Sequence, residues 1–383
     1  MCIIKTDELK ECCSKILAAV DNSDSTNTDA GILQLTVVEN KLILAVTNGE
    51  YFVEVKKDLT GSIADFKASI GAMLFLKLMT QVTTETVEFK VSNQTLLVQA
   101  NGLYKIPLIF QGENMYELAR IDIEQIKANT QVSSKNLYDI MNYNTKEITK
   151  AIQTTLKPVQ KMYLLDSNGC ITFTARGACI NAFDIPNFEG VKVLLNQKLV
   201  KLFKLFDKDE LVEVEVGTKT ITPEITQDRI ILTGNKLRIS AILGCISGLV
   251  NTIPIEAIRA KANYSYNYEV SLSKELLIQA INRLTLLSTF GTVQAKPYCK
   301  FVFNKNGVTI YDTRQENSEV VSYSNPVYAL EGEGYETILD VANLKTTIEG
   351  CAESQITVKM GTHNAILVEF ANIKNVVSEV VAR

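Results

Sequence analysis

A short pattern that occurs three times limits the possible folds of this chain more than any other feature of its sequence. Each copy has a few strand-forming residues, then serine or threonine, then a helix-forming stretch with a leucine near its start. The copies are residues 3–9, 132–137 and 270–276, and their hydroxyl residues are Thr6, Ser134 and Ser273. A hydroxyl at this position can accept a hydrogen bond from a free amide of the first helical turn. We therefore predict that a helix begins at each copy.

Apolar residues continue after each copy at spacings of three and four, which places them along one side of a helix. We predict that each helix buries this side. The residues of the predicted buried sides are Leu9, Cys12, Cys13, Ile16, Leu17 and Val20 in the first copy, Leu137, Ile140, Met141, Ile148, Ala151 and Ile152 in the second, and Leu276, Leu277, Ala280, Ile281, Leu284 and Leu287 in the third.

A second helix follows in each copy, and two strands come directly after it. The helices are predicted to begin after the capping residues Ser69, Asn196 and Asp340. Alternation of apolar and polar residues, which is typical of strands with one buried face, predicts strands at 87–91, 212–216 and 356–360. Apolar strands are predicted at 96–98, 230–232 and 366–368, after turns at Ser92-Asn93, Gly217-Thr218 and Gly361-Thr362.

A sheet with one apolar face needs cover, and helices supply it. The repeat therefore predicts an α+β fold of three repeated domains, each with two helices packed on antiparallel sheets. We place these domains at residues 1–125, 126–260 and 261–383. The length of 383 residues agrees, because it exceeds what one ordinary hydrophobic core supports. Three unrelated α+β domains with ordinary hairpins are the alternative.

The composition is that of a globular protein, with 46% hydrophobic and 21% charged residues. These values exclude a disordered chain, a collagen-like chain and a coiled coil. The sequence has no run of about 18 apolar residues that could span a membrane, and its first residues lack the layout of a signal peptide. The eight cysteines fit no zinc or disulfide spacing. We therefore expect reduced, buried thiols in a reducing compartment.

The sequence offers few residues for catalysis. Its single histidine, His363, lies in a predicted hairpin turn with no cysteine or acidic cluster beside it. No G-x-S-x-G nucleophile elbow, phosphate-binding loop or dinucleotide-binding glycine motif occurs. The carboxylates are scattered among lysines, as on a solvated surface. We therefore expect no metal, no cofactor and no enzymatic activity; a hydrolase with a hidden carboxylate pair is the alternative.

Lysines line one side of the second helix of the middle copy. Lys198, Lys201, Lys204 and Lys208 fall nearly opposite the apolar residues when positions are spaced at 100°. Such a row suits duplex DNA, which carries about one charge per 1.7 Å of axis. A merely solvated helix face is the other interpretation, and the row alone does not decide between them. The net charge of −4 does not favour a general nucleic-acid coat protein.

The order of these features resembles that of the bacterial-type sliding clamps, the beta subunit of DNA polymerase III, over essentially the whole chain. The resemblance rests on the three helix starts, on the three blocks of helix, strand, turn and strand, and on local matches at residues 47–55, 278–288 and 338–341. It is distant and indicates a divergent or phage-encoded member. It implies a DNA clamp fold whose three repeated domains, each with two inner helices, form half of a ring.

The resemblance also implies a non-catalytic processivity factor. Two chains, arranged head to tail, would form a homodimeric ring around duplex DNA and tether the replicative DNA polymerase. The polymerase and the clamp loader would bind through short apolar peptides, in the cytoplasm at the nucleoid or replication site, or in the host cytoplasm of a phage. The cations expected to contact DNA are Lys198, Lys201, Lys204, Lys77, Lys135, Lys274 and Arg283. A clamp-fold interaction scaffold that no longer encircles DNA is the alternative.

Two further sets of residues follow from the resemblance. Tyr104, Leu286 and Leu287 match apolar contacts of the dimer interface. The residues that match the partner-peptide pocket are Gly177, Ile180, Ile253, Pro254, Val380 and Val381. The chain departs from the family here, because residues 178–180 are Ala-Cys-Ile in place of His-Arg-Leu and the tail lacks the usual methionine and proline. An altered peptide preference is therefore expected, and the acidic loop 21–29 is assigned no contact with DNA.

Overall fold

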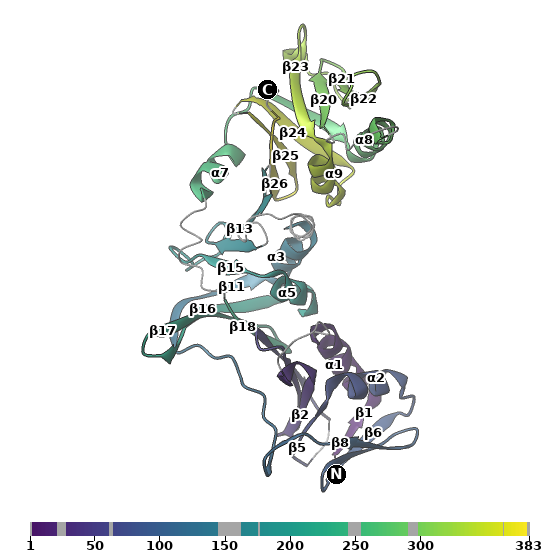
Figure 1. Ribbon diagram of the computed structural model, residues 1–383, viewed down its shortest axis with the longest axis vertical. Coiled ribbons are helices and arrows are strands. Elements are labelled where there is room, and N and C mark those ends of the chain that lie inside the picture. The colour runs from purple at the N-terminus through teal and green to yellow at the C-terminus, as the bar shows by residue number, and fades with distance from the viewer. Residues whose placement is uncertain are drawn as a thin grey trace. The chain divides into compact units, whose positions relative to one another are not determined.

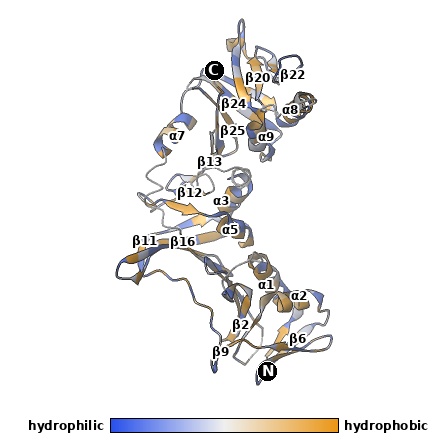
Figure 2. Ribbon diagram, in the orientation of Figure 1, coloured by the Kyte–Doolittle hydropathy of each residue, from blue (hydrophilic) through white to orange (hydrophobic). Residues whose placement is uncertain are grey.

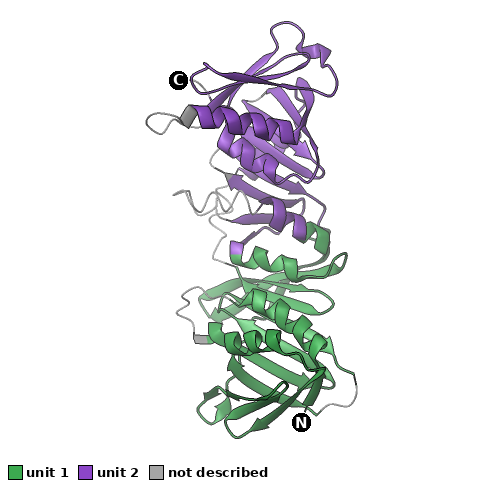
Figure 3. Cartoon of the chain, turned by 90° about the vertical axis from the view of Figure 1, so that its right-hand side faces the viewer, with its two compact units in different colours: residues 1–137, 186–188, 198–245 green, residues 138–185, 189–197, 246–383 purple. Residues whose placement is uncertain are grey.

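The computed structural model describes residues 2–20, 28–60, 64–144, 162–174, 177–243, 254–289, 298–362 and 364–380. The chain divides into two compact units (Figure 3). Unit 1 comprises residues 1–137, 186–188 and 198–245, and unit 2 comprises residues 138–185, 189–197 and 246–383. The predicted middle domain, 126–260, thus contributes to both units, and the predicted domain boundaries stay a prediction.

The same order of elements occurs three times in the described chain: a strand, a helix, four strands, a helix and three strands (Figure 1). The first copy consists of β1 (Cys2–Lys5), α1 (Thr6–Ala19), β2 (Ile32–Val38), β3 (Lys41–Thr47), β4 (Tyr51–Asp58), β5 (Phe66–Gly71), α2 (Ala72–Gln81), β6 (Thr86–Ser92), β7 (Thr95–Gln99) and β8 (Leu103–Pro107). A short 3-10 helix, η1 (Thr28–Gly31), precedes β2, and the small strands β9 (Phe110–Gln111) and β10 (Asn114–Met115) follow β8.

The second and third copies repeat this order and confirm the predicted threefold repeat. The second consists of β11 (Gln125–Ser133), α3 (Ser134–Asp139) with the π-helical turn η2 (Ile140–Asn144), β12 (Tyr163–Asp166), β13 (Gly169–Thr174), β14 (Gly177–Ala182), β15 (Val193–Leu195), α5 (Gln197–Val200) with the 3-10 helix η4 (Lys201–Leu205), β16 (Leu211–Thr222), β17 (Ile225–Thr233) and β18 (Leu237–Ile242). After the connecting helix α7 (Ile255–Ala262), the third consists of β19 (Tyr268–Ser273), α8 (Lys274–Thr289), β20 (Tyr298–Phe303), β21 (Gly307–Tyr311), β22 (Ser318–Ser322), η5 (Tyr328–Leu330), β23 (Tyr335–Asp340), α9 (Val341–Glu349), β24 (Gln355–Thr362), β25 (Ala365–Phe370) and β26 (Ile373–Ser378).

The strands of each copy form two groups of four, and the order within each group is the same in all copies. The first group is β1-β6-β7-β8, and its counterparts are β11-β16-β17-β18 and β19-β24-β25-β26. The second group is β5-β2-β3-β4, and its counterparts are β15-β12-β13-β14 and β23-β20-β21-β22. The repeat is therefore one of topology as well as of sequence pattern.

Groups from different copies join into larger sheets. In unit 1, β18 pairs with β4 in antiparallel orientation, with Leu237 opposite Val55. In unit 2, β14 pairs with β26 in the same way, with Gly177 opposite Val377. Each join makes one eight-stranded sheet, whereas β1-β6-β7-β8 and β22-β21-β20-β23 remain four-stranded.

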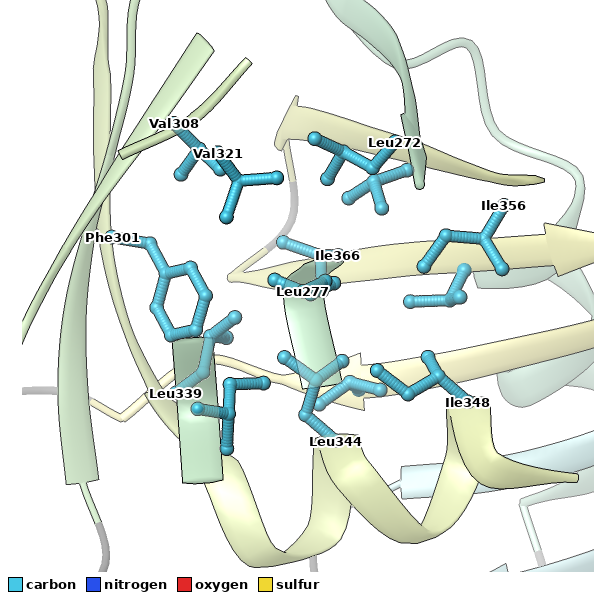
Figure 4. Close-up of a cluster of buried hydrophobic side chains, with 14 of the residues drawn as sticks. Leu272, Leu277, Phe301, Val308, Val321, Leu339, Leu344, Ile348, Ile356 and Ile366 are labelled. Carbon is cyan, nitrogen blue, oxygen red and sulfur yellow. The ribbon is translucent and has the colours of Figure 1, made fainter. Parts of the chain in front are cut away.

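Helices and sheets enclose the core of each unit. In unit 1, α1 packs against α2 and against β3 and β4. In unit 2, Leu277 of α8 and Leu344 of α9 are buried among strand residues that include Phe301 and Ile366 (Figure 4). Figure 2 shows hydrophobic residues along strands such as β16 and β2. Each fully buried large apolar side chain stabilises the fold by about 1.5–3 kcal/mol relative to exposure.

Five of the six predicted helix starts are confirmed, because α1, α3, α5, α8 and α9 begin at the expected residues. The hydroxyl of Ser273 accepts a hydrogen bond from the amide of Leu276, with a distance of 3.4 Å, at the start of α8. The carboxylate of Asp340 accepts from the amide of Asn343 at 3.1 Å and caps α9. Asn196 directly precedes α5.

The predicted caps of the first and second copies are wrong. Thr6 does not cap α1, because its hydroxyl donates to the carbonyl of Thr84 at 2.5 Å. In the second copy Ser134 is buried, and the neighbouring Ser133 accepts from the amide of Lys135. A short hydroxyl side chain can bond any nearby backbone group, so its presence before a helix does not by itself fix the cap.

Two other local predictions also fail for reasons visible in the sheets. α2 begins at Ala72, two residues later than expected, because Ser69 continues β5 and donates its hydroxyl to the carbonyl of Tyr116. The predicted turn at Gly217-Thr218 lies inside β16, which continues to Thr222. A Cβ atom at Gly217 would lie 2.2 Å from the carbonyl oxygen of Gln125 in β11. This glycine permits a close strand contact rather than a turn.

The predicted buried sides of the helices are mostly confirmed. Leu277, Ala280, Ile281 and Leu284 of α8 are buried, but Leu276 and Leu287 are 51% and 53% exposed, so the buried side of α8 is narrower than predicted. Ile148, Ala151, Ile152, Cys245 and His363 lie outside the described residues.

Seven of the eight cysteines are described, and all seven are free and buried, as the sequence predicts for small apolar side chains. Burial raises the pKa of Cys12 to about 11 and that of Cys351 to about 12. Because the thiolate is the reactive form, these thiols are chemically inert in the folded protein.

Candidate functional site

The predicted lysine row lies on α5 and η4. The buried residues of this segment are Leu199, Val200, Leu202, Phe203 and Leu205, and the exposed lysines are Lys198, Lys201, Lys204 and Lys208. From Lys201 the helix is of the 3-10 type, with three residues per turn. Lys201 and Lys204 are therefore better aligned along one side than the α-helical spacing predicts. The predicted exposure of the row is confirmed.

An ion pair is present at each end of this segment. The ammonium group of Lys198 lies 4.0 Å from the carboxylate of Glu50. At the other end, the ammonium group of Lys15 on α1 lies 2.6 Å from the carboxylate of Asp207. The other lysines of the row form no ion pair within the residues that the structure describes, so their charges face solvent.

Two more predicted cations, Lys77 and Lys135, belong to the same unit. Lys77 is exposed on α2 and has no acidic partner in the described part of the chain, and Lys135 is exposed near the start of α3. The helix α1 packs against both α2 and η4. Unit 1 therefore presents Lys77 and the lysine row on helices that share a neighbour.

The two predicted cations of unit 2 are engaged with other groups. Lys274 is half-buried, and its ammonium group donates to the carbonyl of Cys351 at 2.6 Å. Arg283 makes two hydrogen bonds to the carboxylate of Glu319 on β22, at 2.7 and 2.6 Å. These hydrogen bonds raise the pKa of the Arg283 guanidinium. Contact with DNA would require both side chains to exchange these partners.

The predicted interface residues lie at two open sheet edges. Tyr104 is half-buried on β8, beside Leu103, which is 56% exposed. Leu286 and Leu287 are 63% and 53% exposed on α8, which packs against β22. On β22, Val320 is 68% exposed. No described strand pairs with the outer edge of β8 or β22.

Sequence reasoning missed Leu103, Val320 and Glu319. Each is an ordinary residue of a short strand, and only the strand order shows that β8 and β22 are edges. The sequence could indicate an interface at these strands only through an apolar residue on the solvent side of a short strand. Such residues also occur singly on many protein surfaces, so the indication is weak.

A buried carboxylate holds the hairpin that carries β22. Asp312 follows β21 and accepts hydrogen bonds from the amide of Glu316 at 2.9 Å and from the side chain of Asn317 at 2.7 Å. Burial alone would raise the pKa of Asp312, but these hydrogen bonds, with others from nearby amides, lower it below its ordinary value. The ionised carboxylate therefore stabilises the folded hairpin.

We expect Asp312→Asn to lower the free energy of unfolding by about 1 kcal/mol at neutral pH, because an amide cannot accept hydrogen bonds at both positions. The pKa of Asp312 is lower in the folded than in the unfolded state. The contribution is therefore complete above the unfolded pKa, near about 3.9, and is lost as the pH falls through the folded pKa. Urea unfolding of both proteins from neutral pH down to about pH 3 measures the difference, which should shrink only at the acidic end. A pH-independent difference would contradict this account.

Two residues of the predicted peptide pocket lie at the join between β14 and β26. A Cβ atom at Gly177 would lie 2.0 Å from the carbonyl oxygen of Val376. Ile180 is only 2% exposed and belongs to a hydrophobic cluster that includes Ile255 of α7 and Val376 of β26. In this structure both residues help β14 to pack against β26, and their role in peptide binding stays a prediction.

The other predicted pocket residues are only partly described. Pro254 is exposed and directly precedes α7. Val380 is half-buried, and its amide donates to the carbonyl of Ile338 in β23 at 2.8 Å. The C-terminal segment is therefore fixed to the sheet of the third copy up to this residue. Ile253 and Val381 lie outside the described residues.

We expect Gly177→Ala to destabilise the protein by about 1–3 kcal/mol, because the added methyl group overlaps the backbone of β26. Gly71→Ala is the matched control, since no atom lies within 4 Å of a Cβ placed at Gly71. This control should change stability by less than about 0.5 kcal/mol. Urea denaturation measures both effects, and equal stabilities of the two variants would show that the join tolerates a side chain at Gly177.

In the described part of the chain, no group of three or more His, Cys, Asp or Glu side chains is arranged to hold a metal ion. Within the same residues, no helix combines the length and the apolar character that are needed to cross a membrane.

The repeated topology defines the DNA clamp fold, and comparison with solved structures agrees. No protein-family model and no curated protein matches the chain. A DNA polymerase sliding clamp from Pseudomonas aeruginosa matches with a TM-score of 0.75 and 14% identity over 99% of both chains. The sliding clamp from Bacillus subtilis matches with a TM-score of 0.74 and 15% identity, covering 100% of this chain and 99% of that one.

A Helicobacter pylori beta clamp bound to a DNA ligase peptide is similar to the chain with a TM-score of 0.72 and 13% identity over 99% of both chains. The structures that this chain resembles are thus bacterial DNA polymerase III beta sliding clamps. The predicted fold class and the predicted resemblance are confirmed. At this identity, the likeness establishes the fold.

Proposed function

We propose that this protein is a DNA sliding clamp, a ring-shaped processivity factor that encircles duplex DNA and tethers the replicative DNA polymerase. Similarity to solved sliding clamps over nearly the whole chain supports the proposal. The observation that carries it is the pattern of joins between the repeated strand groups, because this pattern leaves two complementary edges unpaired.

Both joins follow one rule. The last strand of a first group pairs with the last strand of the preceding copy's second group: β18 with β4, and β26 with β14. Applied once more, the rule matches β8 of the first copy with β22 of the last. Two chains that exchange these edges head to tail would close a homodimeric ring of six repeats, because heterologous contacts that close generate rings. Exposed Leu103, Val320, Leu286 and Leu287 would then be buried with Tyr104.

The lysine row supports contact with DNA. Ammonium groups that touch phosphates read no bases, so binding would be independent of sequence and would weaken with salt. Lys198, Lys201 and Lys204, with Lys77 and Lys135 of the same unit, would make the main contacts. Lys274 and Arg283 would contribute only after leaving their present partners.

Partner proteins would bind through short apolar peptides, and the chain would perform no chemistry of its own. The Helicobacter pylori clamp with a bound DNA ligase peptide supports peptide binding by this fold. The proposed pocket residues are Gly177, Ile180, Ile253, Pro254, Val380 and Val381. The polymerase and the clamp loader are the proposed partners, in the cytoplasm at the site of replication.

A clamp-fold interaction scaffold that no longer encircles DNA is the second candidate. The net charge of −4 and the altered pocket sequence, Ala-Cys-Ile at residues 178–180, favour it. The two candidates differ in assembly, since a scaffold needs no closed ring. Sedimentation with cross-linking at micromolar concentration separates them: a dimer agrees with the clamp, and a strict monomer with the scaffold.

The direct test measures product length on a primed circular template, with the replicative polymerase and clamp loader of the cell or phage that encodes the protein. We expect much longer products in the presence of the clamp. Protein loaded on the circle should be lost when the DNA is linearised, because a ring slides off free ends. Unchanged product length, or equal retention on circular and linear DNA, would refute encirclement.

A further inference from the structure

A groove beside α7 in unit 2 has the properties of a binding site that the clamp proposal does not use. Its volume is about 640 Å³, which lies within the range of about 300–1,000 Å³ that is usual for ligand sites. One wall is α7, and the opposite side consists of the β12–β13 turn and the segment after β14. The lining includes Asn168, Phe183, Asp184, Glu256, Arg259 and Ala260.

None of the predicted peptide-pocket residues lines the groove, although Pro254 directly precedes α7. The strand β14 runs from Gly177 to Ala182, and the groove lies at the Ala182 end. A ligand in the groove would therefore bind at the end of β14 that is opposite Gly177.

The positive charge that lines the groove is already neutralised. A guanidinium nitrogen of Arg259 lies 2.5 Å from the carboxylate of Asp166, and another donates to the carbonyl of Asn168 at 3.3 Å. The side chains of Arg259 and Asp166 are 14% and 7% exposed, so this pair is shielded from water. The buried Nε–H of Arg259 has no acceptor among the described residues. This lining therefore offers a ligand no free positive charge.

Two carboxylates give the groove its net negative charge. Asp184 follows β14, and Glu256 lies on α7, so the two come from opposite walls. Both side chains are exposed, and neither forms an ion pair within the part of the chain that the structure describes. The half-buried ring of Phe183 and the small side chain of Ala260 add apolar surface to the same lining.

We propose that this groove binds an arginine-bearing segment of a protein partner. A guanidinium can stack on an aromatic ring and bond carboxylates in its plane, which suits a lining that contains Phe183, Asp184 and Glu256. The groove is open rather than enclosed, so a peptide chain can enter and leave it. The two carboxylates repel phosphates, which excludes nucleic acid as the occupant. The proposal does not depend on encirclement of DNA.

The test starts from a random heptapeptide display library, selected on the full-length protein and counter-selected on the D184N/E256Q variant. Both substituted residues are exposed, so the variant should fold normally. We expect enriched peptides with arginine next to an apolar residue. Titration of a labelled selected peptide should show binding about tenfold weaker to D184N/E256Q, because two charge-assisted contacts are lost. Replacing its arginine with neutral citrulline should cause a similar loss.

Glu316→Gln with Glu333→Gln is the matched control, because it removes two exposed carboxylates from the same unit outside the groove. This variant should bind the selected peptide as the unmodified protein does. No enrichment, or selected peptides that bind D184N/E256Q equally well, would overturn the proposal. Displacement of the peptide by spermidine at equal concentration would also overturn it, since the groove would then recognise a small polycation.

Discussion

Replacing Lys198, Lys201 and Lys204 with glutamate should strongly weaken the salt-dependent affinity of the protein for duplex DNA. The three side chains lie exposed on one segment of unit 1, where a 3-10 turn aligns Lys201 with Lys204. Each phosphate contact contributes about 0.9 to the slope of log affinity against log salt concentration, so the slope should fall by about 3. Reversal of charge adds repulsion, so the loss should exceed that of neutral variants.

The measurement titrates the labelled protein with a short linear duplex at several salt concentrations, so that electrostatic contact and not a closed circle determines binding. The matched control changes Lys41, Lys90 and Lys192 to glutamate, which alters the net charge equally on exposed residues outside the helices. This control should retain at least half of the wild-type salt slope. If both triple variants lose the same affinity, the lysine row has no special role in DNA contact. If the variant with glutamate at positions 198, 201 and 204 binds duplex DNA as tightly as the wild type, the lysine row is only a solvated helix face.

Leu286→Asp combined with Leu287→Asp should convert a dimer into monomers. These side chains are 63% and 53% exposed on α8, beside the open edge of β22. Burial of each leucine in an interface would contribute about 1.5–3 kcal/mol, and an unpaired carboxylate in its place carries a further cost. The dimer dissociation constant should therefore rise by at least about a hundredfold.

Sedimentation velocity over a range of concentrations measures this change. Leu211→Asp is the control, because Leu211 is also a leucine with high exposure, at 64%, but belongs to β16 in an eight-stranded sheet. The control should remain a dimer. If the double variant remains a dimer, the dimer interface does not include Leu286 and Leu287. If the wild-type protein is monomeric at every concentration, the proposed pairing of β8 with β22 is wrong.

Much of the fold follows from periodicity. The spacing of Leu277, Ala280, Ile281 and Leu284 predicts a helix with one buried side, and the structure agrees. Such patterns succeed because residue spacing determines which side chains share one side of a helix. Caps are harder to predict, since the Thr6 hydroxyl bonds a carbonyl 78 positions away along the chain. Nothing in the local sequence encodes that partner.

The candidate site was predictable in part. Exposure of the lysine row follows from its spacing. The hydrogen bonds of Arg283 to Glu319 and of Lys274 to the carbonyl of Cys351 depend instead on segments that are distant in sequence. Gly217 shows the same limitation. A glycine is needed at this position because the neighbouring strand β11 leaves no room for a side chain, and not because the chain turns there. Contacts between strands that are far apart in sequence therefore account for most of the errors.

The joined sheets also limit how this chain can evolve. The middle copy supplies four strands to a sheet in each unit, so the unit of duplication differs from the unit of folding. A fragment cut out at residues 126–260 would expose β18 and β14 as unpaired edges, which are sites of aggregation. Recombination that replaced one copy would have to bring a matching edge for each neighbour. Ancestral copies that arose separately must therefore have become mutually dependent, and substitutions in β4 or β26 are constrained by partners inherited from another copy.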